Sequence, residues 1–328
     1  MNFYRVETDE AGQRIDNFLL RLAKGVPKSH VYRVIREGEV RVNKKKVDIT
    51  YRLASGDELR LPPMRTAERA AANARPAEFP ILFEDDHLLV VDKPAGVAVH
   101  GGSGVSYGVI EQLRAARPQA RFLELVHRLD RDTSGVLLLA KKRSALTAVH
   151  EQMREGQIEK RYLVLVSGDW QNARQHVKLS LVKYLSDNAA KVGEPAGERR
   201  VRTAADEDAG ALPAHTVFSL IEKLDSARGS FALLEAELKT GRTHQIRVHL
   251  ASLGFPIAGD DKYGDFALNK ELARPGDFQL KRMFLHAWQI VLIHPATGET
   301  LKLDAALPDD CLGFLEELGA RGRAGRPK

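Results

Sequence analysis

The sequence predicts an α+β protein in which a small segment of helices and strands precedes a domain built on a large mixed, mainly antiparallel sheet. Over residues 79–316, apolar runs with the length and composition of strands recur irregularly among helical patterns. Residues 1–62 carry two short amphipathic patterns and a hairpin pattern. An alanine-rich stretch without apolar periodicity, residues 63–78, is typical of a linker. We therefore expect two domains, which a chain of 328 residues accommodates.

Composition excludes several classes of protein. Hydrophobic residues make up 43% of the chain and charged residues 29%, as in ordinary globular domains. The longest aliphatic run, residues 136–140, is too short to span a bilayer, and the N-terminus lacks the apolar core of a signal peptide. Cys311 is the only cysteine, so neither an intramolecular disulfide nor a cysteine-rich metal site can form. We expect a cytoplasmic protein without membrane association.

The first region is predicted to contain two helices and a strand. The apolar face of the first helix follows the spacing i, i+3, i+4 and i+7, at Ile15, Phe18, Leu19 and Leu22. Ser29 is a favourable N-cap for a second helix, which ends at Gly38. The inward side chains of this helix are Val31, Val34 and Ile35. A strand at residues 40–42 then leads into a turn at Asn43.

Positive charge is concentrated in this region. Residues 12–62 hold twelve Lys or Arg against six Asp or Glu, an excess equal to the net charge of +6 of the whole chain. Clustered cations favour polyanions because binding releases counterions whatever the base sequence. The basic side chains expected on its outer surfaces are Lys28, Arg33, Arg36, Arg41, Lys44, Lys45 and Lys46. On charge alone, a solvated basic surface is an equal alternative. The basic residues 317–328 are expected to form a disordered tail.

The elements of the second region alternate irregularly. Strands are predicted at residues 87–92, 136–141, 162–166 and 234–238, and a helix at residues 144–153. Strands at residues 290–293 and 301–303 flank a turn sequence and are predicted to form a hairpin. Residues 186–212 are poor in apolar side chains and are expected to form an excursion with long loops.

The densest polar cluster is the sequence VHRLDRDTSG at residues 126–135, which directly precedes a buried strand. A polar cluster closed by glycine between apolar segments is typical of a loop at a sheet edge. Composition alone favours an ordinary charged turn here over a catalytic loop. Within the cluster, Asp132 is interpreted as a structural or solvated residue.

A second polar cluster is TGRTHQIRVHL at residues 240–250. Gly241 is predicted to make a turn and Thr243 to cap a helix. The core face of that helix is expected to hold Ile246, Leu250 and Leu253. Arg247 lies off this apolar stripe, where its side chain can reach a neighbouring loop or simply face solvent. Two shorter segments, KRYLV at 160–164 and DKPAG at 92–96, complete the set.

Together these segments resemble the RluA-type pseudouridine synthases, whose signature loop reads HRLD-x-x-TSG. The first region, RIDNFL…VPKSHVYRVIREGEVRVNKKKV…GDELRLP, is similar to the S4-type RNA-binding domain. The resemblance implies a pseudouridine-synthase-type catalytic domain preceded by an S4-like α/β domain. It further implies that Asp130 is the catalytic carboxylate, that Arg247 pairs with it, and that Tyr162 stacks on the target base. A tyrosine that only packs in a strand is the alternative interpretation of Tyr162.

The implied roles are physically consistent. A carboxylate buried beneath a nucleobase tends to become protonated, and an opposed guanidinium keeps it ionised and fixes its direction. The target nucleotide must be flipped out of its stack at a cost of a few kcal/mol. Arg128 resembles the family arginine that fills the vacated space in the RNA, although it can also bind a phosphate. Lys93 and Pro94 are interpreted as architectural supports of the loop.

The implied reaction is an isomerisation. The N1–C1′ glycosidic bond breaks, the uracil rotates, and C5 is joined to C1′. Because substrate and product are isomers, we expect no cofactor and no metal ion. Asp130 can attack C1′, add to C6 of the ring, or take a 2′ proton on a glycal pathway, and the residues do not choose among these. Tyr162 can also help to remove the proton from C5.

The expected partner is 23S ribosomal RNA or its assembly intermediates, because the arrangement resembles the family members that modify this RNA. One chain carries every expected catalytic group, so we expect a monomer. A non-catalytic S4-type RNA-binding or assembly factor would not need Asp130, Arg247 and Tyr162 together. A synthase directed at transfer RNA stays open.

A metal centre is the weakest alternative. His127, His244 and His249 could be combined with Asp130 as ligands. A separation of five residues turns His244 and His249 about 140° apart on a helix, so they do not converge.

Overall fold

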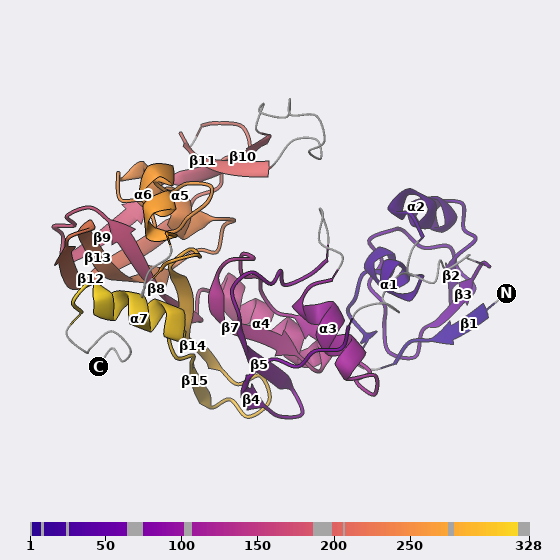
Figure 1. The fold of residues 1–328 in the computed structure, drawn as a ribbon. Helices are drawn as coiled ribbons and strands as arrows, with labels where there is room; N and C mark the ends of the chain where they lie inside the picture. Colours follow the sequence, from indigo (N-terminus) through magenta and orange to yellow (C-terminus); the bar gives the residue numbers. More distant parts are fainter. Residues whose placement is uncertain are drawn as a thin grey trace. The chain divides into compact units, whose positions relative to one another are not determined.

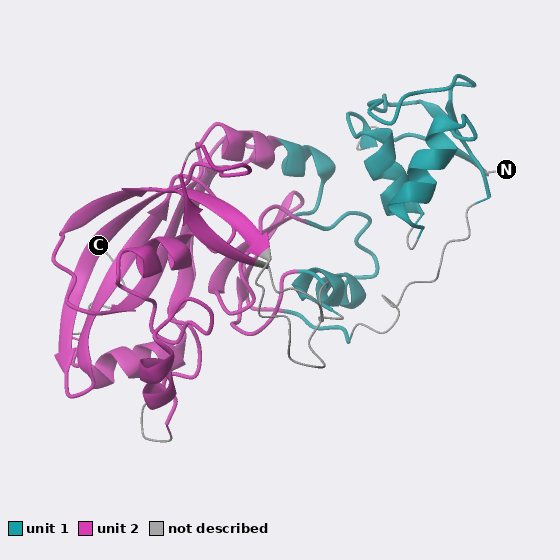
Figure 2. Ribbon diagram, turned by 90° about the horizontal axis from the view of Figure 1, so that it is seen from above, with its two compact units in different colours: residues 1–78, 100–124, 140–147 teal, residues 79–99, 125–139, 148–328 magenta. Residues whose placement is uncertain are grey.

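The computed structural model describes residues 2–7, 10–23, 26–63, 75–101, 107–185, 199–205, 207–274 and 279–320. These residues form two compact units, one of residues 1–78, 100–124 and 140–147 and one of residues 79–99, 125–139 and 148–328 (Figure 2). The predicted α+β class is confirmed. The predicted domain boundaries stay predictions, because most of the linker, residues 64–74, lies outside the described residues.

The N-terminal part of the first unit combines two helices with a small antiparallel sheet (Figure 1). The helices are α1 (Ile15–Leu22) and α2 (Lys28–Arg36), and the strands, in the spatial order β1-β3-β2, are β1 (Asn2–Arg5), β3 (Glu58–Leu61) and β2 (Arg41–Val42). Their shared core contains Ile15, Phe18, Leu19, Val31, Val34, Ile35 and Leu59. Leu22 does not belong to this core, contrary to prediction, because it lies in the last turn of α1 and is 39% exposed.

The start of α2 also differs from the prediction. The helix begins at Lys28 and its N-cap is Pro27, with φ of −58°, so Ser29 is already helical. Proline is compatible with this position because its fixed φ matches a helix start and its missing N–H needs no partner there. At the turn after β2, Asn43 and Lys44 both have positive φ, 50° and 69°. The Asn43 side chain stabilises this turn by donating to Asp57 and accepting from the Glu58 amide.

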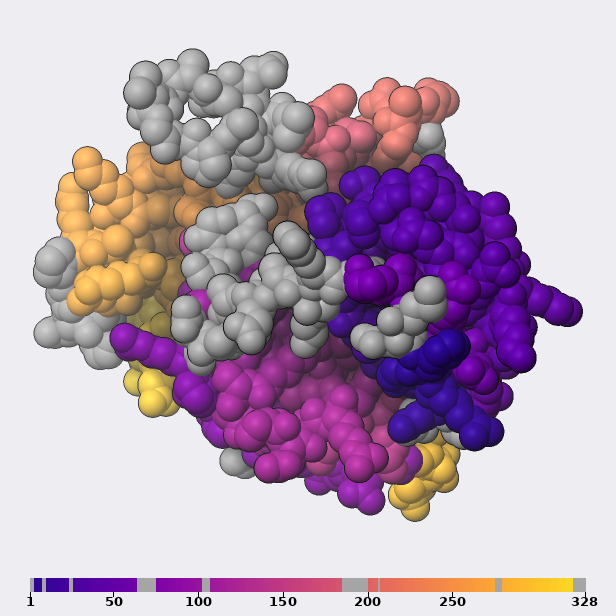
Figure 3. Space-filling view, turned by 90° about the vertical axis from the view of Figure 1, so that its right-hand side faces the viewer, coloured from indigo at the N-terminus to yellow at the C-terminus, as the bar shows by residue number. Residues whose placement is uncertain are grey.

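The predicted RNA-contact residues lie on the surface of this part, which Figure 3 shows in indigo and violet. All seven are exposed: Lys28, Arg33, Arg36, Arg41, Lys44, Lys45 and Lys46. Arg33 forms ion pairs with Glu37 and Glu39, so part of its charge is neutralised within the protein. The first unit also contains α3 (Val109–Ala116).

The second unit is built on a ten-stranded sheet, which confirms the predicted large mixed sheet. Its main path is β4 (Ile81–Glu84), β5 (Leu88–Lys93), β7 (Ser134–Ala140), β14 (Leu285–Ile293), β8 (Glu159–Ser167), β13 (Gly229–Leu238), β12 (His215–Ser226) and β9 (Arg174–Lys178). Two short strands join its sides, β6 (Glu124–Leu125) on β7 and β15 (Thr300–Asp304) on β14. The pairing of β7 with β14 is parallel, whereas β14–β8, β8–β13, β13–β12 and β12–β9 are antiparallel.

Helices complete this unit. They are α4 (Arg143–Arg154), which begins in the first unit, α5 (Gln245–Ser252), α6 (Phe266–Leu272) and α7 (Asp309–Glu317). Phe314 and Leu315 of α7 belong to a buried cluster with Phe231 and Leu233 of the sheet. Leu318 is part of the same cluster, so it is packed in the fold although a disordered tail was predicted from residue 317. Residues 321–328 lie outside the described residues. No described helix is both long and apolar enough to cross a membrane.

A two-stranded ribbon lies beside α5 (Figure 1). It consists of β10 (Ser180–Leu185) and β11 (Arg199–Ala204) in antiparallel pairing. Leu181 and Val201 attach the ribbon by packing against Val248 of α5 and Tyr263. The excursion predicted for residues 186–212 therefore includes a strand, β11, which its low apolar content concealed. Residues 186–198 lie outside the described residues.

Candidate active site

The polar loop between β6 and β7 carries Asp130, and hydrogen bonds join its first residues to β7. The Val126 amide donates to the Leu138 carbonyl at 3.0 Å, and the His127 ring accepts from the Leu138 amide at 3.1 Å. The Thr133 amide donates back to the Asp130 carbonyl at 3.2 Å and closes a tight turn. The Asp130 side chain remains 27% exposed. The loop therefore presents the partly exposed Asp130 carboxylate on a backbone that these bonds fix.

Two residues, Gly135 and Lys93, hold this loop against the neighbouring strands. Gly135 has φ of 107°, and a Cβ there would lie 2.2 Å from the Ala287 carbonyl of β14, so only glycine fits. Lys93 is completely buried and its ammonium donates to three carbonyls, those of Pro94, Val97 and Arg131. Burial lowers the pKa of Lys93 to about 7, against the opposing effect of the Asp132 charge. Lys93 thus bridges the end of β5 to the residue after Asp130.

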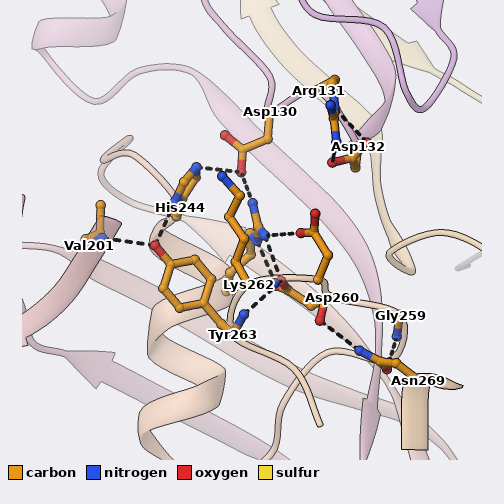
Figure 4. A network of polar contacts seen from close by, with 12 residues as sticks. Asp130, Arg131, Asp132, Val201, His244, Gly259, Asp260, Lys262, Tyr263 and Asn269 are labelled. Atoms are coloured by element: carbon orange, nitrogen blue, oxygen red, sulfur yellow. Dashed lines mark hydrogen bonds and ion pairs between the residues drawn. The ribbon is translucent and has the colours of Figure 1, made fainter. Parts of the chain in front are cut away.

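Arg247 is the centre of the site (Figure 4). Its Nε and Nη2 donate to the two oxygens of Asp260, each at 2.7 Å, and its Nη1 donates to Oδ2 of Asp130 at 3.2 Å. Asp261 also accepts from Nη2, at 3.3 Å. The Arg247 side chain is only 3% exposed. Burial disfavours its charge, but the bonds and charges of Asp260 and then Asp130 outweigh burial and raise the pKa of Arg247.

The helix that carries Arg247 differs from the prediction in two respects. Its N-cap is His244 rather than Thr243, and His244 adopts the left-handed conformation with φ of 51°. The helix is also buried on every side rather than along one stripe, from Gln245 to Leu250. Arg247 is consequently buried and reaches the loop of Asp130 from the protein interior, whereas an amphipathic helix would place it on a partly solvated face.

Asp260 was not singled out by the sequence, although it is the strongest partner of Arg247. Burial alone would raise its pKa, but the hydrogen bonds from Arg247 and from the Lys262 and Tyr263 amides lower it overall. Its turn depends on Gly259, where a Cβ would lie 2.0 Å from the Arg282 carbonyl. A pair of acidic residues directly after this glycine, at Asp260 and Asp261, is the signal that could have identified the turn.

His244 and Tyr263 extend the network on the other side of Asp130. The Nε2 atom of His244 lies 3.8 Å from Oδ2 of Asp130. The Nδ1 atom of His244 lies 2.8 Å from the Tyr263 hydroxyl, which accepts from the Val201 amide at 3.0 Å. The ring of Tyr263 also lies under the Arg247 guanidinium, 5.1 Å from its centre. A strand of the ribbon is therefore connected to the neighbourhood of Asp130.

The two other predicted site residues, Tyr162 and Arg128, form no hydrogen bond with Arg247 in the part of the chain that the structure describes. Tyr162 lies in β8 with 7% exposure, where burial and the charge of Asp130 both raise the pKa of its hydroxyl. The neutral phenol is thereby favoured over a phenolate that would accept a proton. Arg128 is exposed. The catalytic and RNA-contact roles of the predicted residues stay predictions.

The metal-site alternative has no geometric support in the part of the chain that the structure describes. No group of three His, Cys, Asp or Glu side chains is arranged there to hold a metal ion. His127 accepts from the Leu138 amide, and His249 is bonded to Thr216 and to the Leu179 carbonyl. Of the three histidines considered, His244 is the one near Asp130.

Comparison with protein families gives two matches. Residues 87–252 match the RNA pseudouridylate synthase family, and residues 13–59 match the S4 domain. The chain is 50% identical over 321 residues to ribosomal large subunit pseudouridine synthase C of Escherichia coli O157:H7, covering 95% of each chain. It is 49% identical over 320 residues to the protein of the same name from Haemophilus influenzae, covering 95% of this chain and 94% of the relative.

Solved structures agree with these matches. Human RNA pseudouridylate synthase domain containing 4 superposes with a TM-score of 0.55 at 27% identity, over 73% of this chain and 92% of its own. Human RNA pseudouridylate synthase domain containing 1 gives the same TM-score at 25% identity, over 72% of this chain and 87% of its own.

Proposed function

Because this chain belongs to the RNA pseudouridylate synthase family, we propose that it isomerises uridines of 23S ribosomal RNA to pseudouridine, with Asp130 as the catalytic carboxylate. The single observation that carries the role of Asp130 is its pairing with buried Arg247 while more than a quarter of its side chain stays exposed. The choice of RNA rests on the relatives, which are named for the large ribosomal subunit. A cytoplasmic location follows, because ribosomes are assembled there.

The reaction requires a carboxylate that is ionised and aimed at one nucleoside. Arg247 supplies a positive charge at Oδ2, which favours the carboxylate over the acid. The other oxygen, Oδ1, is then available to attack C1′ or C6, or to take a 2′ proton. In each pathway the N1–C1′ bond breaks, C5 bonds to C1′, and the C5 proton is replaced by a proton on N1. Atoms and electrons balance without a second substrate.

The remaining residues act on the RNA. The target uridine leaves its stack to reach Asp130, and exposed Arg128 occupies the space that it vacates. Tyr162 packs against the flipped base as a neutral phenol, in agreement with its raised pKa. The S4 domain contributes affinity through its exposed cations, whose phosphate contacts do not depend on base sequence. One chain holds all of these groups, so we propose that a monomer is sufficient.

The test maps pseudouridine in 23S RNA by carbodiimide modification and primer extension. Cells lacking this protein are rescued with wild type, Asp130→Asn or Asp132→Asn. Asp132 is the matched control, since it is a carboxylate of the same loop that pairs with exposed Arg131. We expect defined sites to disappear in the deletion strain and to return with wild type and Asp132→Asn only.

Other outcomes separate the parts of the proposal. Persistence of every site in the deletion strain would exclude 23S RNA as the sole target, and the same assay would then be applied to transfer RNA. Full rescue by Asp130→Asn would remove the catalytic assignment. Loss of ribosome assembly without loss of any pseudouridine would favour a non-catalytic RNA-binding factor.

A further inference from the structure

We infer that His244 is a second positioning residue for Asp130, acting as a neutral imidazole whose Nε2–H is aimed at Oδ2 by a hydrogen-bond chain from the Val201 amide through Tyr263. The inference rests on the proposed role of Asp130 and adds to it a residue that sequence reasoning considered only as a metal ligand. Figure 4 shows the chain, with the Tyr263 hydroxyl between Val201 and His244 and the imidazole between Tyr263 and Asp130.

The direction of the chain follows from its first member. A backbone amide can only donate, so the Tyr263 oxygen accepts from Val201 at 3.0 Å. The single phenol proton is then free to be donated to Nδ1 of His244, 2.8 Å away. Burial raises the pKa of Tyr263 to about 12, so this proton is present at neutral pH. An imidazole that accepts at Nδ1 carries its own proton on Nε2, which is the atom that faces Asp130.

The two other states of His244 are less favourable. The opposite tautomer would turn the Nε2 lone pair toward the Asp130 carboxylate and would take the Nδ1 acceptor from the phenol. A doubly protonated ring is opposed first by burial. The charge of Asp130 favours it, but burial together with the positive charges of Arg247 and Lys262 lowers the pKa of His244 overall. The neutral Nε2–H form satisfies every member of the chain.

The position of His244 explains why it can act together with Arg247. His244 is the N-cap of α5 and Arg247 lies in the first turn, so one helix start presents two donors to the same carboxylate. Both face Oδ2, at 3.2 Å for Arg247 and 3.8 Å for His244. The longer distance exceeds hydrogen-bond length. Catalytic contacts are often this long in active sites without substrate and tighten when substrate binds. When both donors bond to Oδ2, the carboxylate cannot rotate freely, and Oδ1 keeps its direction.

Tyr263 orients both donors at once, because its hydroxyl contacts His244 and its ring supports Arg247. Its hydroxyl also receives the amide of Val201, a residue of the ribbon strand β11. The arrangement of Asp130 therefore depends on how the ribbon is seated on α5. A purely structural histidine would contribute to stability without changing kcat, so the kinetics distinguishes the two roles.

The kinetic test measures kcat and KM of the full-length enzyme on a 23S RNA fragment that contains a target uridine. The variants are His244→Ala, His244→Gln and Tyr263→Phe, with His176→Gln as the matched control. His176 is an exposed ring on β9 whose Nδ1 lies 3.1 Å from Nε2 of the His215 ring. A thermal melt of each variant controls for folding.

We expect His244→Ala to lower kcat about 10- to 100-fold with KM changed less than about threefold, because an oriented donor to a charged group is lost. His244→Gln should recover much of kcat, since its amide nitrogen can occupy the place of Nε2. Tyr263→Phe should lower kcat to an intermediate value, and His176→Gln should match wild type. Wild-type kcat in His244→Ala at unchanged melting temperature would overturn the inference.

A spectroscopic test does not depend on turnover. Nitrogen-15 NMR of histidine-labelled protein distinguishes the two tautomers, and the signal that disappears in His244→Gln assigns the ring. We expect the Nε2–H tautomer in wild type and a mixture of tautomers in Tyr263→Phe. An Nδ1–H tautomer in wild type would overturn the inference even if the enzyme is active. An inactive wild type with the Nε2–H tautomer would instead count against the proposed function and leave the hydrogen-bond chain in place.

Discussion

Arg247 lies between two aspartates that differ in almost every physical respect. Asp260 is 1% exposed and both of its oxygens accept from Arg247. It also accepts from the amides of Lys262 and Tyr263. Asp130 is 27% exposed, and its contact with Arg247 is a single longer bond to one oxygen. Arg247 thus binds one carboxylate, Asp260, whose oxygens are all hydrogen-bonded, and another, Asp130, that keeps an oxygen free to accept further bonds.

The difference suggests a division of labour. A buried guanidinium needs a fully bonded partner to offset its desolvation, and Asp260 provides it. Two parallel bonds at 2.7 Å also fix the plane of the guanidinium, so the third nitrogen, Nη1, has a defined position. Asp130 can therefore be oriented by one bond and still keep an oxygen for chemistry. Variants at the two aspartates should separate activity from stability.

The largest effect is expected for activity in Asp130→Asn. The amide keeps the shape of the side chain but cannot act as nucleophile or base, so kcat should fall by about 10⁴-fold or more. Its unfolding free energy should change by less than about 1 kcal/mol, since the side chain is partly exposed and makes one bond to Arg247. Single-turnover assays on RNA and urea unfolding of the same preparation measure the two quantities. A large loss of stability would remove the contrast with Asp260.

The next largest effect is expected for Arg247→Met, which removes the bonds to both Asp260 and Asp130. Asp260 would be left as a buried charge with backbone donors only, at a cost of about 3–5 kcal/mol in unfolding free energy. Activity should also be lost, because Asp130 loses its positively charged partner. Arg247→Lys tests geometry, because lysine keeps the charge but cannot bond in parallel to both oxygens of Asp260. Stability close to wild type in Arg247→Lys would show that charge alone matters.

How much of the site could be predicted depends on whether a residue lies in a segment with a recognisable residue order, and not on its distance along the chain. Asp130 and Arg247 lie in segments whose residue order resembles a family, and the sequence therefore suggested their pairing across 117 positions. Asp260 and Tyr263 lie in a turn that no periodicity marks, and Val201 lies in a region poor in apolar residues. Hydrophobic patterns report one buried face, so they misplaced Leu22 and did not foresee a helix buried on all sides. N-cap preference, which favours threonine, placed the start of α5 one residue too early.

A smaller effect, mainly on stability, is expected for Asp260→Asn. The amide can accept one bond from Arg247 but not a parallel pair, so the loss should be about 2–3 kcal/mol at neutral pH. Activity should fall only in part, about tenfold, since Nη1 loses its fixed position but not its charge.

The pH dependence of this loss has a defined sign. The folded pKa of Asp260 lies below its unfolded value, so its contribution is present above the unfolded pKa and is lost as pH falls through the folded pKa. The difference between wild type and Asp260→Asn should therefore be full at pH 7 and shrink below about pH 4. Urea unfolding at several pH values measures it. A difference that grows on acidification would contradict the ionised state of Asp260.

The smallest effect is expected for Asp261→Asn, which makes the same chemical change one residue further along. Asp261 is 56% exposed and 3.3 Å from Nη2 of Arg247, so solvent screens the pair. Its loss should cost less than about 1 kcal/mol in unfolding free energy, decrease further in high salt, and leave kcat within about twofold. Asp260 and Asp261 both contact Nη2 of Arg247. A larger loss of unfolding free energy in Asp260→Asn than in Asp261→Asn would therefore reflect burial of the pair rather than its charge. Equal losses in the two variants would mean that Asp260 holds Arg247 no more firmly than a surface carboxylate does.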